Sequence, residues 1–113
     1  MIEICLNNKL DILDIGASKN SPHNYRGRVR KVVGIDISEE VLANSNLDEA
    51  YQCSATKMPF ENNRFDLAFA DYLIEHLPEP MKAAKEIYRV LKPNGMLLIR
   101  KSLIRYIDER EGS

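Results

Sequence analysis

Four short runs rich in apolar residues constrain the fold of this chain more than any other feature of its sequence. They are Leu10–Ile15, Lys31–Ile37, Phe65–Ala70 and Met96–Ile99. Runs of this length without apolar–polar alternation are typical of strands that are buried on both faces of a sheet. A weaker candidate, Glu49–Cys53, brings the expected number of strands to about five.

Two helices are expected between these strands. Ser38 is placed to cap a short helix that has two glutamates in its first turn, where carboxylates favour the helix dipole, and that ends at residues 44–46. A longer helix begins near Glu79 and stops at Pro93-Asn94-Gly95. The core-facing stripe predicted for the longer helix is Met81, Ala84, Ile87, Tyr88 and Leu91.

Strands that alternate with helices across short turns predict a parallel α/β sheet with right-handed crossovers, because parallel neighbours cannot be joined by hairpins. Such sheets bind ligands beyond the carboxyl ends of their strands. The chain has 113 residues and shows no repeat or linker. We therefore expect residues 1–113 to form a single domain with a modest core.

Charge and composition give little information about partners. The formal net charge is −1, which indicates neither a nucleic acid nor a membrane as a partner. No apolar run approaches the roughly 20 residues of a membrane span, so a soluble, cytoplasmic protein is expected. Cys5 and Cys53 lack the spacing of a metal site or a disulfide framework. We expect both to be buried free thiols without a catalytic role, and we predict no metal site.

The first candidate binding segment follows the first strand and reads Leu13-Asp14-Ile15-Gly16-Ala17-Ser18. Gly16 permits a tight turn and a close approach of the backbone to a ligand, and Asp14 can accept hydrogen bonds from a cation. An ordinary strand-to-loop turn explains this segment equally well when it is taken alone.

The second candidate segment is Val33-Gly34-Ile35-Asp36-Ile37-Ser38, and its acid lies 36 − 14 = 22 positions after Asp14. In nucleotide-binding α/β folds, an acid about 20 residues on, at the end of the second strand, accepts hydrogen bonds from ribose hydroxyls. The alternative is that Asp36 only caps the following helix. The spacing favours the nucleotide site.

These two strand ends and three later segments resemble the class I S-adenosylmethionine-dependent methyltransferases, particularly their type 11 branch. The resemblance runs from about Leu10 to Ile99. The later segments are Met58-Pro59-Phe60 with Phe65-Asp66, Ile74-Glu75-His76-Leu77-Pro78, and Glu86-Ile87-Tyr88-Arg89-Val90-Leu91-Lys92-Pro93-Asn94-Gly95. The resemblance implies a Rossmann-like, doubly wound sheet of about five mostly parallel strands in the order 3-2-1-4-5, without the final two strands of the family's usual seven.

The resemblance also implies a site for S-adenosylmethionine. The residues that it places around the cofactor are Asp14, Gly16 and Ala17 at the methionine part, Asp36 at the ribose hydroxyls, Ile37 on the adenine, and Ser54, Ala55 and Met58 on the other side of the adenine.

Three positions depart from the family's pattern. Ser18 and Asn20 stand where the family commonly has its second and third glycines. Asparagine tolerates a positive φ, whereas serine does so poorly. Ser54 stands where many relatives have an aspartate that accepts from the adenine amino group, and its hydroxyl is a weaker, uncharged acceptor.

Catalytic candidates lie after the fourth strand. Methyl transfer from a sulfonium depends mainly on alignment in a water-poor site, and a base is needed only where the nucleophile carries a proton. Asp71 and His76 are the candidates, and His76 could accept a substrate proton near neutral pH. The alternative is that Asp71 caps the next segment and that His76 packs a turn beside Pro78.

A basic cluster precedes the second strand and consists of Arg26, Arg28, Arg30 and Lys31. A phosphate-rich substrate could use such a cluster. A solvated basic turn is the preferred interpretation, because no aromatic residue beyond Tyr25 is interleaved for base stacking.

The leading hypothesis is an S-adenosylmethionine-dependent methyltransferase that acts on an unidentified acceptor. The main alternative is a catalytically inactive methyltransferase-like binding or regulatory module. A nicotinamide dinucleotide enzyme is a weaker third possibility, because a pyrophosphate would require glycines at Ser18 and Asn20. The fifth strand is expected to be an exposed apolar edge, which favours a homodimer joined there.

Overall fold

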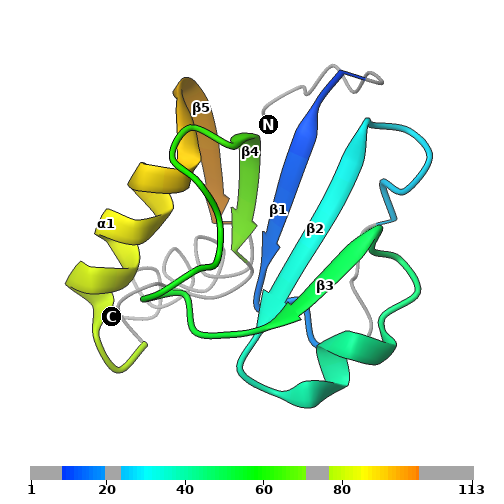
Figure 1. Cartoon of the computed structure of the whole chain (residues 1–113), viewed down its shortest axis with the longest axis horizontal. Coiled ribbons are helices and arrows are strands. Elements are labelled where there is room, and N and C mark those ends of the chain that lie inside the picture. The colour runs from blue at the N-terminus through cyan, green and yellow to red at the C-terminus, as the bar shows by residue number, and fades with distance from the viewer. Residues whose placement is uncertain (1–8, 20–23, 71–76, 100–113) are drawn as a thin grey trace, which may run out of the picture.

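Five parallel strands and two helices make up the part of the chain that the computed structural model describes, residues 9–19, 24–70 and 77–99. The elements are β1 (Asp11–Ile15), β2 (Lys31–Asp36), the 3-10 helix η1 (Glu39–Ala43), β3 (Glu49–Gln52), β4 (Phe65–Ala70), α1 (Pro80–Val90) and β5 (Leu91–Ile99). The strands lie in the order β3-β2-β1-β4-β5, with their carboxyl ends toward the bottom of Figure 1. The predicted Rossmann-like arrangement is confirmed.

β1 lies at the centre of the sheet and is buried along its whole length. It pairs with β2 on one side and β4 on the other, so that Leu13 is level with Val33 and Ala68. Because successive side chains of a strand point to opposite faces, the core consists of two clusters. Leu13 belongs to the cluster beneath α1, and Ile12 belongs to the cluster on the opposite face, beneath η1.

The short helix expected after β2 is present as η1. The Ser38 hydroxyl accepts a hydrogen bond from the Glu40 amide at 3.2 Å, and Asn44 ends the helix. Its 3-10 geometry is usual for a helix of this length. Neither helix in the described residues is long and apolar enough to cross a membrane.

α1 begins where the sequence predicts, but it turns a different face to the core. Its buried residues are Ala83, Ile87 and Val90. The predicted stripe was therefore wrong except at Ile87 and at Leu91, which packs partly buried against the same core as the first residue of β5. The members of that stripe that face solvent are Met81, Ala84 and Tyr88. The cause is long-range, because Glu86 and Arg89 form hydrogen bonds with residues 58–62 and thereby fix the rotation of the helix.

β5 begins earlier than predicted. The helix ends at Val90, and Leu91 already pairs with Phe65 of β4. The register then shifts, so that Met96 pairs with Leu67. The intervening residues form a bulge that accommodates Pro93, which has no amide hydrogen to donate. β5 is the outermost strand of the described sheet, and the homodimer through this edge stays a prediction.

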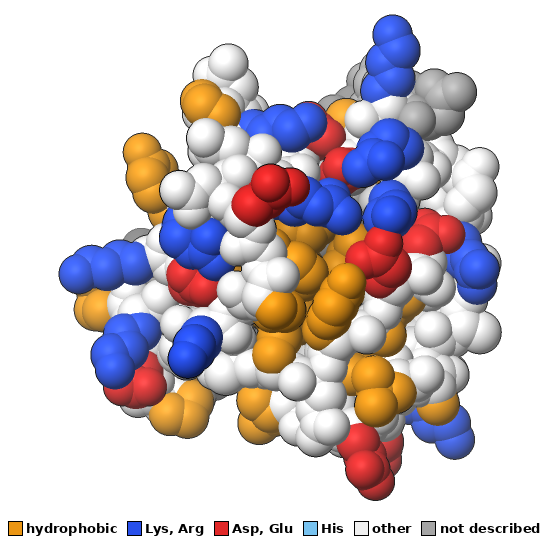
Figure 2. Space-filling model, viewed as in Figure 1, with side chains coloured by type: hydrophobic (Ala, Val, Ile, Leu, Met, Phe, Trp, Pro, Cys, Tyr) orange, Lys and Arg blue, Asp and Glu red, His pale blue; other side chains and the backbone are white. Residues whose placement is uncertain are grey.

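Charged side chains gather at the amino ends of the strands, toward the top of Figure 2. Asp11 is the most buried of them, with a side chain that is 7% exposed. Its Oδ2 atom is ion-paired with Arg30 and, at 2.9 Å, with Nη1 of Arg64. The backbone amide of Asp11 donates to Asp66 Oδ2 at 2.8 Å. This network joins the start of β1 to the segments that precede β2 and β4.

The basic cluster before β2 is largely neutralised by neighbouring acids. Its ion pairs are Arg26 with Asp48, Arg30 with Asp11, and Lys31 with Glu49. The Lys31 ammonium and the Tyr51 hydroxyl hold the pKa of Glu49 below its usual value, which keeps this partner ionised. Pairing within the fold accounts for three of the four charges and favours the interpretation as a solvated turn.

Candidate functional site

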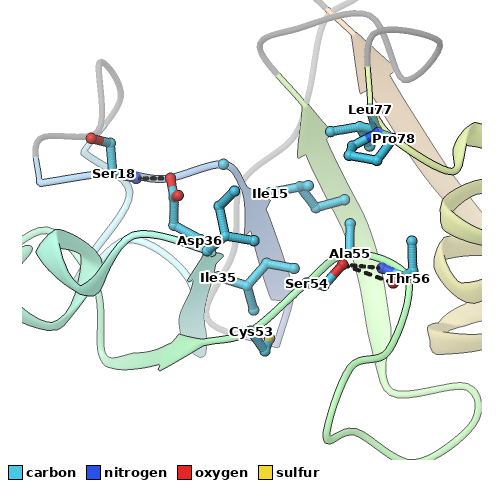
Figure 3. A pocket seen from close by; sticks show the side chains of 12 residues that line it. Ile15, Ser18, Ile35, Asp36, Cys53, Ser54, Ala55, Thr56, Leu77 and Pro78 are labelled. Atoms are coloured by element: carbon cyan, nitrogen blue, oxygen red, sulfur yellow. Dashed lines mark hydrogen bonds between the residues drawn. The ribbon is translucent and has the colours of Figure 1, made fainter.

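A pocket of about 390 Å³ opens at the carboxyl ends of β1 and β2 (Figure 3). Its lining residues are Ile15, Gly16, Ser18, Ile35, Asp36, Ile37, Cys53, Ser54, Ala55, Thr56, Leu77 and Pro78. This is where doubly wound sheets bind ligands, and the volume is within the range of about 300–1,000 Å³ of small-molecule sites. Among the lining residues that the structure describes, Asp36 is the one acid.

The turn after β1 forms one wall of the pocket. Gly16 has a φ of +74° and Ser18 a φ of +56°, so the chain enters the left-handed region twice within three residues. The amides of Gly16 and Ala17 donate to the carbonyl oxygen of Ile35 at 2.9 and 3.0 Å. These bonds hold the backbone of the turn against the end of β2.

Asp36 joins the ends of the two strands. Its Oδ2 atom accepts a hydrogen bond from the Ser18 amide at 2.8 Å, and its Oδ1 atom accepts one from the Ser38 amide at 3.0 Å. Asn44 supports the same turn from the other side, because its Nδ2 atom donates to the Ser18 carbonyl at 3.1 Å. A carboxylate has about four acceptor positions, so Asp36 retains capacity for ligand hydroxyls.

The opposite wall consists of residues 53–56 and 77–78. The Ser54 hydroxyl lies 2.8 Å from the Thr56 hydroxyl and accepts from the Thr56 amide at 3.1 Å (Figure 3). Both contacts tighten the turn. Burial, and to a lesser degree the negative charge of Glu86, raises the pKa of the Cys53 thiol. Cys53 is therefore a protonated lining residue and a poor nucleophile at neutral pH.

Most residues that the sequence indicates for the cofactor meet in this pocket. Those that line it are Gly16, Asp36, Ile37, Ser54 and Ala55. Asp14 does not line it, because alternation along β1 turns its side chain away from the face of Ile15. Ala17 is buried on the far face of the sheet, where the missing side chain of Gly34 leaves room for Leu47 and, less tightly, for Ala17. Met58 is buried in the core beneath α1.

Several lining residues had no assigned role in the sequence, namely Ile15, Ser18, Ile35, Cys53, Thr56, Leu77 and Pro78. Leu77 and Pro78 belong to a segment that the sequence singled out only as a block of the family pattern. The candidate catalytic residues Asp71 and His76, together with Asn20 and Cys5, lie outside the described residues.

Comparison with known proteins identifies the family. The family model described as a methyltransferase domain, of type 11, matches residues 13–99, which include every described residue that lines the pocket. The chain belongs to this methyltransferase family. Among the curated relatives, a sterol 4-C-methyltransferase from Caenorhabditis elegans is 34% identical to this chain over 100 residues, which cover 80% of this chain and 26% of that protein.

Two solved structures share the methyltransferase fold. The (4+2)-cyclase SpnF is 28% identical with a TM-score of 0.71, over 81% of this chain and 38% of that chain. A SAM-dependent methyltransferase from Aquifex aeolicus is 25% identical with a TM-score of 0.65, over 82% of this chain and 56% of that chain. The family and this last structure imply S-adenosylmethionine as the cofactor. The chain spans about a quarter of the length of the sterol methyltransferase that it matches.

The pocket fits this cofactor on three counts. Apart from its chain neighbours, no residue that the structure describes lies within 4 Å of the position that a Cβ atom on Gly16 would occupy, so a ligand can approach the backbone there. Asp36 presents a carboxylate at the rim, as ribose hydroxyls require. Ile37, next to Asp36, is 73% exposed and offers an apolar surface to a nucleobase.

Replacing Ser18 with glycine is expected to stabilise the protein by about 0.5–1 kcal/mol, because serine at a φ of +56° carries strain that glycine does not. Urea unfolding measures the change. Ser45→Gly is the matched control. Ser45 is an exposed serine that is not among the described residues with positive φ. Glycine at position 45 relieves no strain and only adds conformational entropy to the unfolded chain, so Ser45→Gly should reduce stability. Equal destabilisation by both variants would contradict the assignment of strain to Ser18.

Proposed function

We propose that this chain binds S-adenosylmethionine in the pocket and supports transfer of its methyl group to an acceptor that is still unidentified. One observation supports this most. The carboxylate of Asp36 and the glycine turn of β1 meet at one ligand-sized opening, joined by the 2.8 Å bond from the Ser18 amide. The Ser18 amide also holds the turn close to the carboxylate, which prepares the binding surface before a ligand arrives.

Each part of the pocket has a separate task in this proposal. The bound cofactor supplies an electrophilic methyl group on a sulfonium. Asp36 holds the ribose hydroxyls, and the exposed side of Ile37 packs against the adenine on one side. Ser54 and Ala55 lie against the other side of the adenine. Leu77 and Pro78 exclude water from the opening, which favours a reaction that depends on alignment.

A calorimetric titration with S-adenosylmethionine, its demethylated product S-adenosylhomocysteine, and NAD tests the proposal. We expect the first two to bind and NAD not to bind, because Ser18 stands where a pyrophosphate requires glycine. Failure of both S-adenosyl compounds to bind would overturn the proposal. Release of S-adenosylhomocysteine in the presence of an acceptor panel then measures turnover.

A binding or regulatory module without turnover is the second candidate. SpnF bears on methyl transfer, though not on loss of turnover, because its fold matches this one with a TM-score of 0.71 while its name describes a cyclase and not a methyltransferase. A shared fold does not fix the reaction. Binding of both S-adenosyl compounds without turnover on any acceptor would favour this candidate. For the methyltransferase candidate, Asp71 and His76 remain the predicted catalytic residues.

A further inference from the structure

Glu86 and Arg89 of α1 form hydrogen bonds with residues 58–62, the segment that follows the pocket wall at residues 53–56. Arg89 Nη1 donates to the carbonyl oxygen of Phe60 at 2.7 Å and to Asn62 Oδ1 at 2.9 Å. Its Nη2 atom donates to the carbonyl oxygen of Met58 at 3.2 Å. The Glu86 Oε2 atom accepts from the Met58 amide at 2.6 Å. Both polar groups of the Met58 backbone are thus bound by one helix.

Glu86 and Arg89 are also bound to each other in a two-pronged ion pair. The Arg89 Nε atom donates to Glu86 Oε1 at 2.7 Å, and Nη2 donates to Oε2 at 2.8 Å. The side chains are 15% and 32% exposed, so solvent screens this pair less than a surface pair. The Arg89 guanidinium is the main cause that lowers the pKa of Glu86, and it keeps the carboxylate ionised.

The segment 58–62, which α1 holds by these bonds, follows closely after residues 53–56 of the pocket wall. Met58 lies two residues after Thr56, and the Lys57 amide donates to the Ser54 carbonyl at 3.1 Å, which closes the turn between them. α1 itself begins at Pro80, two residues after Pro78, which with Leu77 belongs to the same wall (Figure 3). One helix therefore positions both pieces of the wall that faces Asp36.

We propose that Arg89, paired with Glu86, is a positioning residue for the nucleoside side of the pocket, which sets the place of residues 54–56 and so the affinity for S-adenosyl compounds. This inference rests on the proposed function. Arg89 does not itself line the pocket, and its effect passes through the backbone of Met58. A purely structural brace would change the stability of the fold but leave the affinity of the folded protein unchanged.

The test compares Arg89→Gln, Arg89→Lys and the control Lys85→Gln. Lys85 is exposed on the same helix, so its variant removes an equal charge without touching the wall. Affinity for S-adenosylhomocysteine is measured by calorimetry in buffer where urea unfolding shows each variant to be folded. We expect about tenfold weaker binding for both Arg89 variants, because lysine lacks the planar fork that reaches several acceptors, and no change for Lys85→Gln.

Two outcomes would overturn the inference. Unchanged affinity in folded Arg89→Gln would make the pair a structural brace only. Full affinity in Arg89→Lys would show that a positive charge beside Glu86 suffices and that the fork is not needed. Both outcomes differ from a failure of the proposed function, in which the unmodified protein itself would not bind the compound.

Amide resonances of the ligand-free protein give a readout that is independent of binding. Arg89→Gln is expected to shift the amides of residues 54–57 and to leave those of Gly16 and Ser18, on the opposite wall, in place. Unshifted resonances at 54–57 would overturn the inference whether or not the compound binds.

Discussion

Replacing Asp36 with alanine is expected to weaken binding of S-adenosylmethionine by about 10-fold to 150-fold, or about 1.5–3 kcal/mol, measured by calorimetry. The loss has two sources. Ribose hydroxyls lose a charged acceptor, and the Ser18 amide loses the Oδ2 atom that holds the β1 turn in place. Hydrogen bonds to a charged group are the strong kind, which is why this single change has the largest effect expected in the pocket.

Two further variants are compared with Asp36→Ala: one controls for the lost charge, and the other disturbs the β1 turn alone. Glu40→Ala removes a charge from the nearby helix η1, where the side chain is exposed, and should leave affinity unchanged. Asn44→Ala removes the support of the Ser18 carbonyl but keeps the carboxylate, and should weaken binding less than Asp36→Ala. Unchanged affinity in Asp36→Ala would remove this carboxylate from the binding site.

Replacing Asp11 with alanine is expected to lower the free energy of unfolding by about 2–4 kcal/mol. Asp11 is buried at the start of the central strand, and without it the Arg64 side chain, which is 18% exposed, keeps a charge with no ion-pair partner among the described residues. The Oδ1 atom of Asp11 is buried without a hydrogen-bond partner among the described residues, which reduces the net contribution of the network. Urea unfolding at neutral pH measures the loss.

The matched control for Asp11 is Glu61→Ala, which removes an acid that is exposed in the segment before β4. This control should change stability by less than about 0.5 kcal/mol. A loss below about 1 kcal/mol in Asp11→Ala would show that the network contributes no more than an exposed ion pair.

The strands could be predicted because their signal is local. Phe65–Ala70 has the bounds predicted for it, since five of its six residues are apolar, as expected for a buried strand of a parallel sheet, and polar residues stand on both sides. The capping of η1 by Ser38 was equally local. The rotation of α1 could not be predicted from a local signal. Ile87 belongs to two apolar stripes, and only the bonds from Glu86 and Arg89 to distant residues select one of them.

The same distinction applies to the pocket. Gly16 and Asp36 stand directly at strand ends, where the topology of the sheet places ligands, so their position follows from the strand pattern. Leu77 and Pro78 reach the pocket only because α1 packs against the sheet and brings the preceding residues over the opening. Nothing in their immediate sequence indicates this contact.

The position of β1 at the centre of the sheet also constrains how the chain folds. Ile12 pairs with Val32, which is 32 − 12 = 20 residues away, but its other partner, Leu67, is 67 − 12 = 55 residues away. Long-range parallel pairing of this kind is slow, because the entropy of closing the loop is lost before the contact between the strands stabilises the chain. During synthesis on the ribosome, one edge of β1 therefore stays open until β4 has emerged, and a nascent chain halted before that point exposes to aggregation a strand that is fully buried in the folded protein.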